Sequence, residues 1–280
     1  MKTNHFKNLL IPLLVLNVLV FNACSDEELI VENNSVDDVT EMSRAAEMDA
    51  MDVALGDLVV NAFEEQERGV LGRSSYNNNL PECVVITAVV EQNSVEVNID
   101  FGTEGCLVNG NLIRGQIEIS YTRNPEAMQM LINYNLVDFY FNNKNVAATR
   151  TILRERFNEN GNPQFTHSLD VTVTWPNGLQ ASRSGEKVRE WIEGFGSGTF
   201  NDNVFLITGF WNASFVNGNE HNYEVIEALR REIGCLYFVS GAVEVTRTNF
   251  AGVLDYGDGD CDALATFTFN NGVEIPINLD

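Results

Sequence analysis

The chain has 280 residues, of which 44% are hydrophobic, and its formal net charge is −23 at pH 7. An acidic excess of this size repels nucleic acid and anionic lipid surfaces, so we expect neither as a partner. The length and the apolar content allow one large β-domain or two small ones.

The first 23 residues have the pattern of a secretory signal peptide. Lys2 and Lys7 form a basic start, and an almost uninterrupted apolar run follows over residues 9–20. This run is shorter than the roughly 20 residues that a membrane-spanning helix needs, so a transmembrane anchor is the weaker alternative. We therefore expect residues 1–23 to be removed from the mature protein.

A lone cysteine directly after this segment indicates lipidation. Ala23 precedes Cys24, and the pair resembles the lipobox of bacterial lipoproteins, in which the cysteine is acylated and becomes the new N-terminus. The acidic run at 25–28 looks like the export tag that sends such lipoproteins to the cell surface. The resemblance implies an outer-membrane lipoprotein, held in the membrane by its N-terminal lipid and exposed at the surface. A protein that faces the periplasm, or a plain secretory signal with a stray cysteine, are the alternatives.

Residues 24–80 are expected to form an acidic tether that contains one helix. Apolar residues recur at helical spacing between about residues 38 and 67, which predicts an amphipathic helix with one apolar face. Ser35 is a candidate N-cap, and Gly69 is a stop signal. The asparagine-rich segment 76–79 would link this helix to the rest of the chain.

Residues 81–280 are dominated by strand patterns. Apolar and polar residues alternate in many short runs, for example over 94–101 and 169–175. Asn-Gly pairs, which favour tight hairpins with positive φ at both positions, separate such runs at 109–110, 160–161, 177–178, 217–218 and 271–272. The predicted fold class is therefore all-β. About a dozen antiparallel strands would form a meander, as a sandwich, an open barrel or a long twisted sheet.

One segment of this β region fits two kinds of element. The apolar residues between 223 and 233 also follow helical spacing and end before Gly234. The place of the segment between a hairpin signal and Cys235 favours a strand.

The chain contains an internal repeat. Residues 99–106 match residues 254–261, since both segments read aliphatic, Asp, aromatic, Gly, three small or acidic residues, and Cys. Another cysteine, Cys83 or Cys235, opens an apolar run before each copy. The two units would span residues 83–122 and 235–280.

The repeat suggests how the cysteines pair. Five cysteines are an odd number for a secreted protein, and lipidation of Cys24 would account for the odd thiol. If the two units are equivalent, the simplest pairing is Cys83–Cys106 and Cys235–Cys261. Swapped pairings and a zinc site are the alternatives, although no Cys-x-x-Cys spacing is present.

The repeated Asp-aromatic-Gly elements carry a resemblance to a known group. Together with the segments 189–194 and 239–244, they are similar to a family of uncharacterised Bacteroidota lipoproteins over roughly residues 83–280. The family has no established activity. The resemblance therefore implies an all-β fold and a place in the cell envelope.

The sequence contains few patterns that are typical of catalysis. His167 opens a strand and His221 follows a hairpin, positions at which we expect solvated side chains. There is no nucleophile elbow, zinc-protease helix or phosphate loop. No spacing singles out two of the 40 acidic residues as a catalytic pair. We expect no catalytic residue and no cofactor, and a carboxylate-based hydrolase is an alternative.

Four aspartates crowd one loop near the C-terminus and form a weak candidate for a calcium site: Asp255, Asp258, Asp260 and Asp262. Calcium favours clustered carboxylates on glycine-containing turns. If Asp258 were the first position of an EF-hand loop, however, Phe269 would stand where the loop needs Glu. The simpler expectation is that Asp100 and Asp255 stabilise turns by binding local backbone amides.

Aromatic residues are the remaining candidates for ligand binding, above all Tyr140, Trp175, Trp191 and Trp211. Exposed rings beside Asn and Asp would stack on sugars, whereas core packing is the alternative. The sequence as a whole predicts a lipid-anchored, non-catalytic binding or structural module of the cell envelope. Its partner would be a glycan or an envelope protein, and surface glycan binding through exposed aromatic rings is the second hypothesis.

Overall fold

The computed structural model describes residues 29–70, 80–124, 126–199, 201–247 and 251–279. The chain divides into two compact units, Met1–Val39 and Thr40–Asp280. The second unit holds the whole sheet and most of the helix. Cys24 and the signal segment lie outside the described residues, so the lipid anchor stays a prediction.

One helix and fourteen strands make up the regular structure of the described residues. The helix is α1 (Leu29–Val70). The strands are β1 (Val85–Glu91), β2 (Ser94–Asp100), β3 (Cys106–Val108), β4 (Asn111–Thr122), β5 (Gln129–Phe141), β6 (Lys144–Glu155), β7 (Gln164–Thr174), β8 (Gln180–Glu193), β9 (Val204–Phe215), β10 (Glu220–Glu232), β11 (Ser240–Arg247), β12 (Ala251–Asp258), β13 (Leu264–Phe269) and β14 (Glu274–Asn278).

All fourteen strands belong to one antiparallel sheet. Strands pair in chain order from β1 to β14, except that the short β3 pairs with β4 off this path. β1 and β14 are the two edges, so the sheet is open. The all-β meander is confirmed, and it takes the form of a single long sheet. The segment 223–233 is also confirmed as a strand, since β10 covers it almost entirely.

The Asn-Gly pairs lie at hairpin connections, as expected, but their turns are of two kinds. At 109–110 both residues have positive φ, 46° for Asn109 and 79° for Gly110, as the tight hairpin requires. At the other four pairs the glycine alone has positive φ. In three of them the asparagine Oδ1 accepts a hydrogen bond from the backbone two residues on, as Asn177 does from Leu179. Such Asx turns suit a slightly longer loop.

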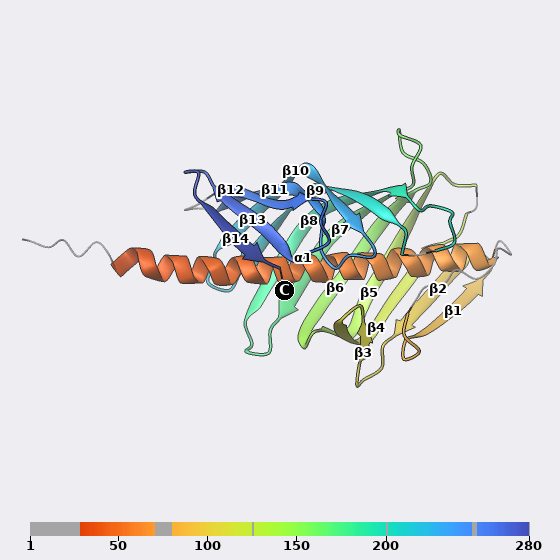
Figure 1. Cartoon of the computed structure of the whole chain (residues 1–280). Coiled ribbons are helices and arrows are strands. Elements are labelled where there is room, and N and C mark those ends of the chain that lie inside the picture. The colour runs from red at the N-terminus through yellow and green to blue at the C-terminus, as the bar shows by residue number, and fades with distance from the viewer. Residues whose placement is uncertain (1–28, 71–79, 125, 200, 248–250, 280) are drawn as a thin grey trace, which may run out of the picture. The chain divides into compact units, whose positions relative to one another are not determined.

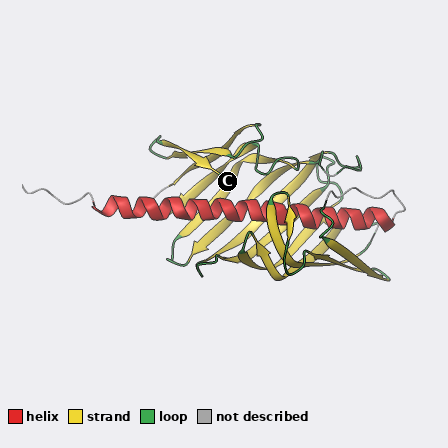
Figure 2. Cartoon of the chain, turned by 60° about the horizontal axis from the view of Figure 1, so that its bottom comes forward, coloured by secondary structure: helices red, strands yellow, loops and turns green. Residues whose placement is uncertain are grey.

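The sheet curves around the part of α1 from Thr40 onward, which crosses the strands on the concave side (Figures 1 and 2). Alternate residues of the strands point toward the helix. On β2, for example, Val95, Val97 and Ile99 are at most 2% exposed, whereas their neighbours face outward. The side chains of α1 and those of the inner sheet face form one continuous core within Thr40–Asp280.

The helix differs from the amphipathic element that we expected. It begins at Leu29, so Ser35 lies inside it and is not its N-cap. From Met51 to Glu64 every residue except Ala54 is buried, the polar ones included. A helix on a flat surface keeps one face in water, but this one is enclosed because the sheet curves around it.

The expected domain division must be corrected for the same reason. We predicted an acidic tether up to about residue 80 and a separate β-domain after it. Residues from Thr40 onward instead belong to the same compact unit as the sheet. This part of the helix is therefore a core element.

The two disulfides join the cysteines within each repeat unit. Cys83 is bonded to Cys106, and Cys235 is bonded to Cys261, with Cα–Cα distances of 5.8 and 5.6 Å. The pairing expected from the internal repeat is confirmed. The two units lie at opposite ends of the strand order.

Candidate functional site

The concave face of the sheet carries a concentration of positive charge. Among the described residues, nine of its basic side chains form ion pairs with carboxylates of α1: Arg123, Lys144, Arg150, Arg154, Arg183, Lys187, Arg189, Arg231 and Arg247. The chain has 17 basic residues in all. In a protein with a net charge of −23, more than half of the positive charge thus faces one helix. The lining of the sheet is electrostatically complementary to α1.

The densest part of this contact surrounds Asp52. Arg150 Nη2 donates to Asp52 Oδ1 at 2.5 Å. Lys187 Nζ and Arg183 Nη1 lie 3.4 and 3.7 Å from Oδ2 of the same carboxylate. Asp49, one turn earlier, accepts from Arg183 at 2.6 Å and from Lys187 at 3.0 Å. Two buried carboxylates therefore share three buried cations.

The cations determine the protonation state of Asp52. Burial by itself would raise the pKa of this carboxyl, because a poorly solvated site penalises the charged form. The positive charges of Arg150, Lys187 and Arg183 outweigh the burial, so that the pKa of Asp52 lies well below its usual value. The ionised carboxylate is therefore an integral part of the folded state.

A second cluster is centred on Asp57. Its Oδ2 accepts from Arg231 Nη2 at 2.9 Å, and its Oδ1 accepts from Arg189 Nη2. Gly56 permits this arrangement, since a Cβ at that position would lie only 2.5 Å from Nη1 of Arg189. Arg231 also donates to backbone carbonyl oxygens, among them that of Cys235. Both oxygens of Asp57 are thus engaged by cations.

A single carboxylate, that of Glu41, binds the sheet near the first described side chains of the helix. Glu41 Oε2 lies 3.0 Å from Nε2 of His221 and 3.1 Å from Nη1 of Arg247. Burial raises the pKa of Glu41, but hydrogen bonds from Asn219 and Asn217 and the charge of Arg247 lower it below the usual value.

Toward the C-terminal end of α1, the cations of the sheet compensate the burial of the helix carboxylate less strongly. Glu64 lies 3.4 Å from Nη2 of Arg154. Here burial dominates and raises the pKa of Glu64 above its usual value. Glu67, near the helix end, accepts hydrogen bonds from the hydroxyl of Tyr121 at 2.9 Å and from Arg123 Nε at 3.1 Å.

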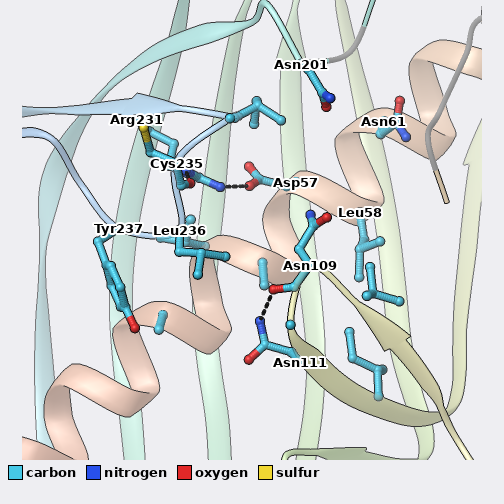
Figure 3. Close-up of a pocket in the computed structure, with 18 of the residues that line it drawn as sticks. Asp57, Leu58, Asn61, Asn109, Asn111, Asn201, Arg231, Cys235, Leu236 and Tyr237 are labelled. Atoms are coloured by element: carbon cyan, nitrogen blue, oxygen red, sulfur yellow. Dashed lines mark hydrogen bonds and ion pairs between the residues drawn. The ribbon is translucent and has the colours of Figure 1, made fainter. Parts of the chain in front are cut away.

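A cavity of about 500 Å³ lies beside the Asp57 cluster (Figure 3). Its floor is α1, and its walls include the β3–β4 turn and the segment that follows β10. Asn61 of the helix lines it and is 3% exposed, and its Oδ1 accepts no hydrogen bond from any residue that the structure describes. A buried amide oxygen without a donor costs about 1–3 kcal/mol. The cavity is thus bordered by both disulfide-bonded units and by an unsatisfied polar group.

The two histidines are not the solvated residues that we predicted. His221 is fully buried, with Nδ1 3.0 Å from the hydroxyl of Tyr223 and Nε2 against Glu41. His167 is 4% exposed and faces the helix side of the sheet. Burial and the nearby charge of Arg189 hold the pKa of His167 well below its usual value. Both side chains lie at inward positions of their strands, and the enclosed helix removes the solvent that we expected around them.

The aromatic candidates divide into core residues and partly exposed ones. Trp191 and Trp211 are 2% and 1% exposed, so the hypothesis that they are surface sugar platforms is wrong. Trp175 is half-buried and donates from Nε1 to Glu47 Oε2 at 2.9 Å. Tyr140 is also half-buried, and the guanidinium of Arg114 lies 3.8 Å above its ring. None of these four residues lines the cavity.

The aspartate loop forms turns. Asp255 Oδ1 accepts from the backbone N–H of Gly257 at 2.8 Å, and Asp100 Oδ1 accepts from that of Gly102 at 2.7 Å. The two repeat units therefore use the same Asx turn, which confirms the expectation that Asp100 and Asp255 bind local backbone amides. Asp262 caps the next turn in the same way, while Asp258 and Asp260 are exposed. Within the described residues no group of three or more His, Cys, Asp or Glu side chains is placed to hold a metal ion.

Sequence reasoning did not identify the helix carboxylates or their partners as a unit. A signal was present on β8, where Arg183, Lys187 and Arg189 have the same phase as Ala181 and Trp191 and therefore point inward. Cations at core-facing positions of a strand require buried counter-charges. The acids scattered through the apolar pattern of the helix were the matching half of this signal.

Of the helical segments among the described residues, none is both long and apolar enough to cross a bilayer. No protein-family model, no curated protein and no solved structure matches the chain.

Proposed function

We propose that this chain is a lipid-anchored, non-catalytic lipoprotein of the outer membrane, in which α1 fastens the β body to an acylated Cys24. The lipobox-like sequence at Cys24 supports the anchor, and only four residues separate Cys24 from Leu29, where α1 begins. The resemblance to Bacteroidota lipoproteins points to the same location. The acidic run at 25–28 favours the outer face of the membrane.

The observation that carries this proposal is the row of ion pairs along α1, most of which are buried. Between Glu41 and Glu67 the helix is paired with cations of the sheet at several successive turns. A pull on the lipidated end would have to drag ionised carboxylates out of their buried pairs, and breaking such a pair costs about 3–5 kcal/mol. The helix is therefore suited to hold the body firmly on its anchor.

The same contacts support a non-catalytic role for the concave face. A hydrolase needs carboxylates that are available to a substrate. The carboxylates that gather here, at Asp49, Asp52 and Asp57, are buried and engaged by Arg and Lys side chains. These carboxylates bind the helix to the sheet through ion pairs.

Mass spectrometry of the protein purified from its native host tests the anchor. We expect a mature N-terminus at Cys24 that carries diacylglycerol, and a Cys24→Ala variant that is not lipidated and leaves the membrane fraction. A mature wild-type protein without the lipid would overturn the proposal. Protease added to intact cells separates the two membrane faces, because only a surface-exposed body would be cleaved.

Hydrogen exchange on the full chain tests the fastening role of the helix. We expect the backbone amides of residues 45–64 to exchange as slowly as those of the central strands β7 to β9. If these helix amides exchanged much faster than the strands, α1 would detach without unfolding of the sheet, and it could not hold the body on its anchor.

A further inference from the structure

The cavity beside Asp57 has the features of a ligand site. Its volume of about 500 Å³ falls within the range of pockets that bind small molecules. The β3–β4 turn of the first disulfide-bonded unit forms one wall, and Ile233–Tyr237, which leads into the second unit at Cys235, forms another. Figure 3 shows Asn109 and Leu236 facing each other across the helix that forms the floor. Two covalently closed units thus border one hollow, which keeps its walls in place.

The charges around the cavity are already paired. Asp57 and Arg231 are the charged residues among the described lining side chains. Asp57 uses one oxygen for Arg231 and the other for Arg189, and Arg231 is also bound to the carbonyl oxygen of Cys235. In a chain with 20% charged residues, this lining offers no unpaired charge to an ionic ligand. The ligand that fits is neutral.

Amide side chains supply the polar groups that are left for a ligand. Asn61 on the floor, Asn109 in the β3–β4 turn and Asn201 in the β8–β9 connection all line the cavity. The Oδ1 of Asn61 has no donor among the described residues. An amide both donates and accepts hydrogen bonds, and a hydroxyl group does the same. Several amides from different elements therefore match a molecule with several hydroxyl groups.

The remaining lining includes apolar side chains, and the cavity is open to solvent on one side. Leu58 and Ile113 form the inner apolar surface, and Leu236, which is 53% exposed, stands at the mouth beside Tyr237. A sugar ring presents an apolar C–H face together with a rim of hydroxyl groups. An extended peptide would instead use the backbone of a free strand edge, and β1 and β14, the edges of the main sheet, contribute no residue to the described lining.

We propose that this cavity binds a neutral saccharide of one or two sugar units. Asn61, Asn109 and Asn201 bind its hydroxyl groups, and Leu58, Ile113 and Leu236 contact its apolar face. The inference goes beyond the proposed anchoring function and is independent of the lipid on Cys24. The lining of this site includes none of the four aromatic candidates Tyr140, Trp175, Trp191 and Trp211, two of which lie in the core.

A binding screen on the full natively processed chain tests this site. The protein is kept in a zwitterionic detergent, because glucoside and maltoside detergents would compete for the cavity. The probes are neutral mono- and disaccharides, with their acidic and amino-sugar counterparts and a set of short neutral peptides as comparison arms, and calorimetry measures the dissociation constant. We expect neutral saccharides to bind and the charged sugars and the peptides to be at least tenfold weaker.

Variants connect the binding to the cavity. Asn61→Leu replaces the buried amide with an apolar side chain that has the same branching, and Leu236→Trp narrows the mouth at an exposed position where folding is not at risk. Each should weaken saccharide binding at least tenfold, whereas Asn133→Ala, an exposed amide on β5, should leave it unchanged. The proposal would be overturned if no neutral saccharide bound, or if the protein preferred peptides or charged sugars. It would also be overturned if both cavity variants left saccharide binding intact. A chain that lacks the lipid but binds the saccharide would refute the anchor alone.

Discussion

Asp52 and Glu64 are both buried carboxylates on the same helix, yet their pKa values are shifted in opposite directions. Asp52 lies among Arg150, Lys187 and Arg183, and its pKa is lowered well below the usual value despite complete burial. Glu64 faces Arg154 at 3.4 Å, and burial raises its pKa. Both lose water to the same enclosing sheet. The number and closeness of the facing cations therefore decide whether a buried acid is held as a charge.

The largest effect is expected from neutralising Asp52. The change Asp52→Asn keeps the size of the side chain but leaves Arg150 and its neighbours without their counter-charge in a buried site. We expect a loss of about 3–5 kcal/mol in the free energy of unfolding, measured by urea denaturation. Glu47→Gln is the control, because the side chain of Glu47 is 40% exposed, and its pair with Lys144 should contribute at most about 1 kcal/mol. Equal effects of the two changes would contradict the comparison.

Removing a disulfide gives a reference of similar size that does not depend on charge. The double variant Cys83→Ala with Cys106→Ala opens a loop with a sequence separation of 23, and Cys235→Ala with Cys261→Ala opens one of 26. Each should cost about 3 kcal/mol. The cost should be the same at pH 3 and pH 7, in urea denaturation of the variants against the wild-type chain. A strong pH dependence would show that the disulfides act through the ion pairs.

Acid should weaken the fold through Asp52. The folded pKa lies below the unfolded one, so the stabilisation is complete above about pH 4 and is lost as the pH falls toward the folded pKa. We expect a loss on the order of 2 kcal/mol from this residue by pH 2. Denaturation curves at several pH values check this, and the Asp52→Asn variant must lack this part of the dependence. An identical acid response of variant and wild type would assign the loss to other groups.

The smallest effect is expected at Glu64. Because its folded pKa is raised, the folded state favours the protonated form, and lowering the pH through that folded pKa increases its contribution to stability. Glu64→Gln should therefore leave the free energy of unfolding at pH 7 within about 1 kcal/mol of the wild type, or raise it. Thermal denaturation at pH 7 measures the change. A loss as large as that of Asp52→Asn would mean that Arg154 compensates Glu64 fully.

Much of the β architecture could be predicted because its signals are local. Alternation along β2, the Asn-Gly pairs and the repeated Asp-aromatic-Gly-x-x-x-Cys elements each act over a few residues. The Asx turns at Asp100 and Asp255 and both disulfides followed from the match between two segments of the chain. At Asn177 the hairpin was predicted correctly, but the prediction of positive φ at both turn positions was wrong, because only Gly178 has positive φ.

The candidate site was less predictable, because it is made by segments that are far apart in the chain. The floor of the cavity comes from α1, and its walls come from residues near 110 and 235. The histidines and tryptophans were misplaced for a related reason. A strand pattern indicates which residues share a face, but it does not say whether another element covers that face.

The amino-acid order alone specified an acidic, all-β chain with two disulfide-bonded repeats, because period-two patterning, turn residues and cysteine spacing act locally. The folded arrangement was needed to show that the helix is enclosed by the sheet, that Asp52 stays ionised there, and that Asn61 is left beside an open cavity. The solvation of a side chain and the charges that face it depend on packing between distant segments, and a carboxylate in a sequence has the same form whether it later lies in water or among three cations.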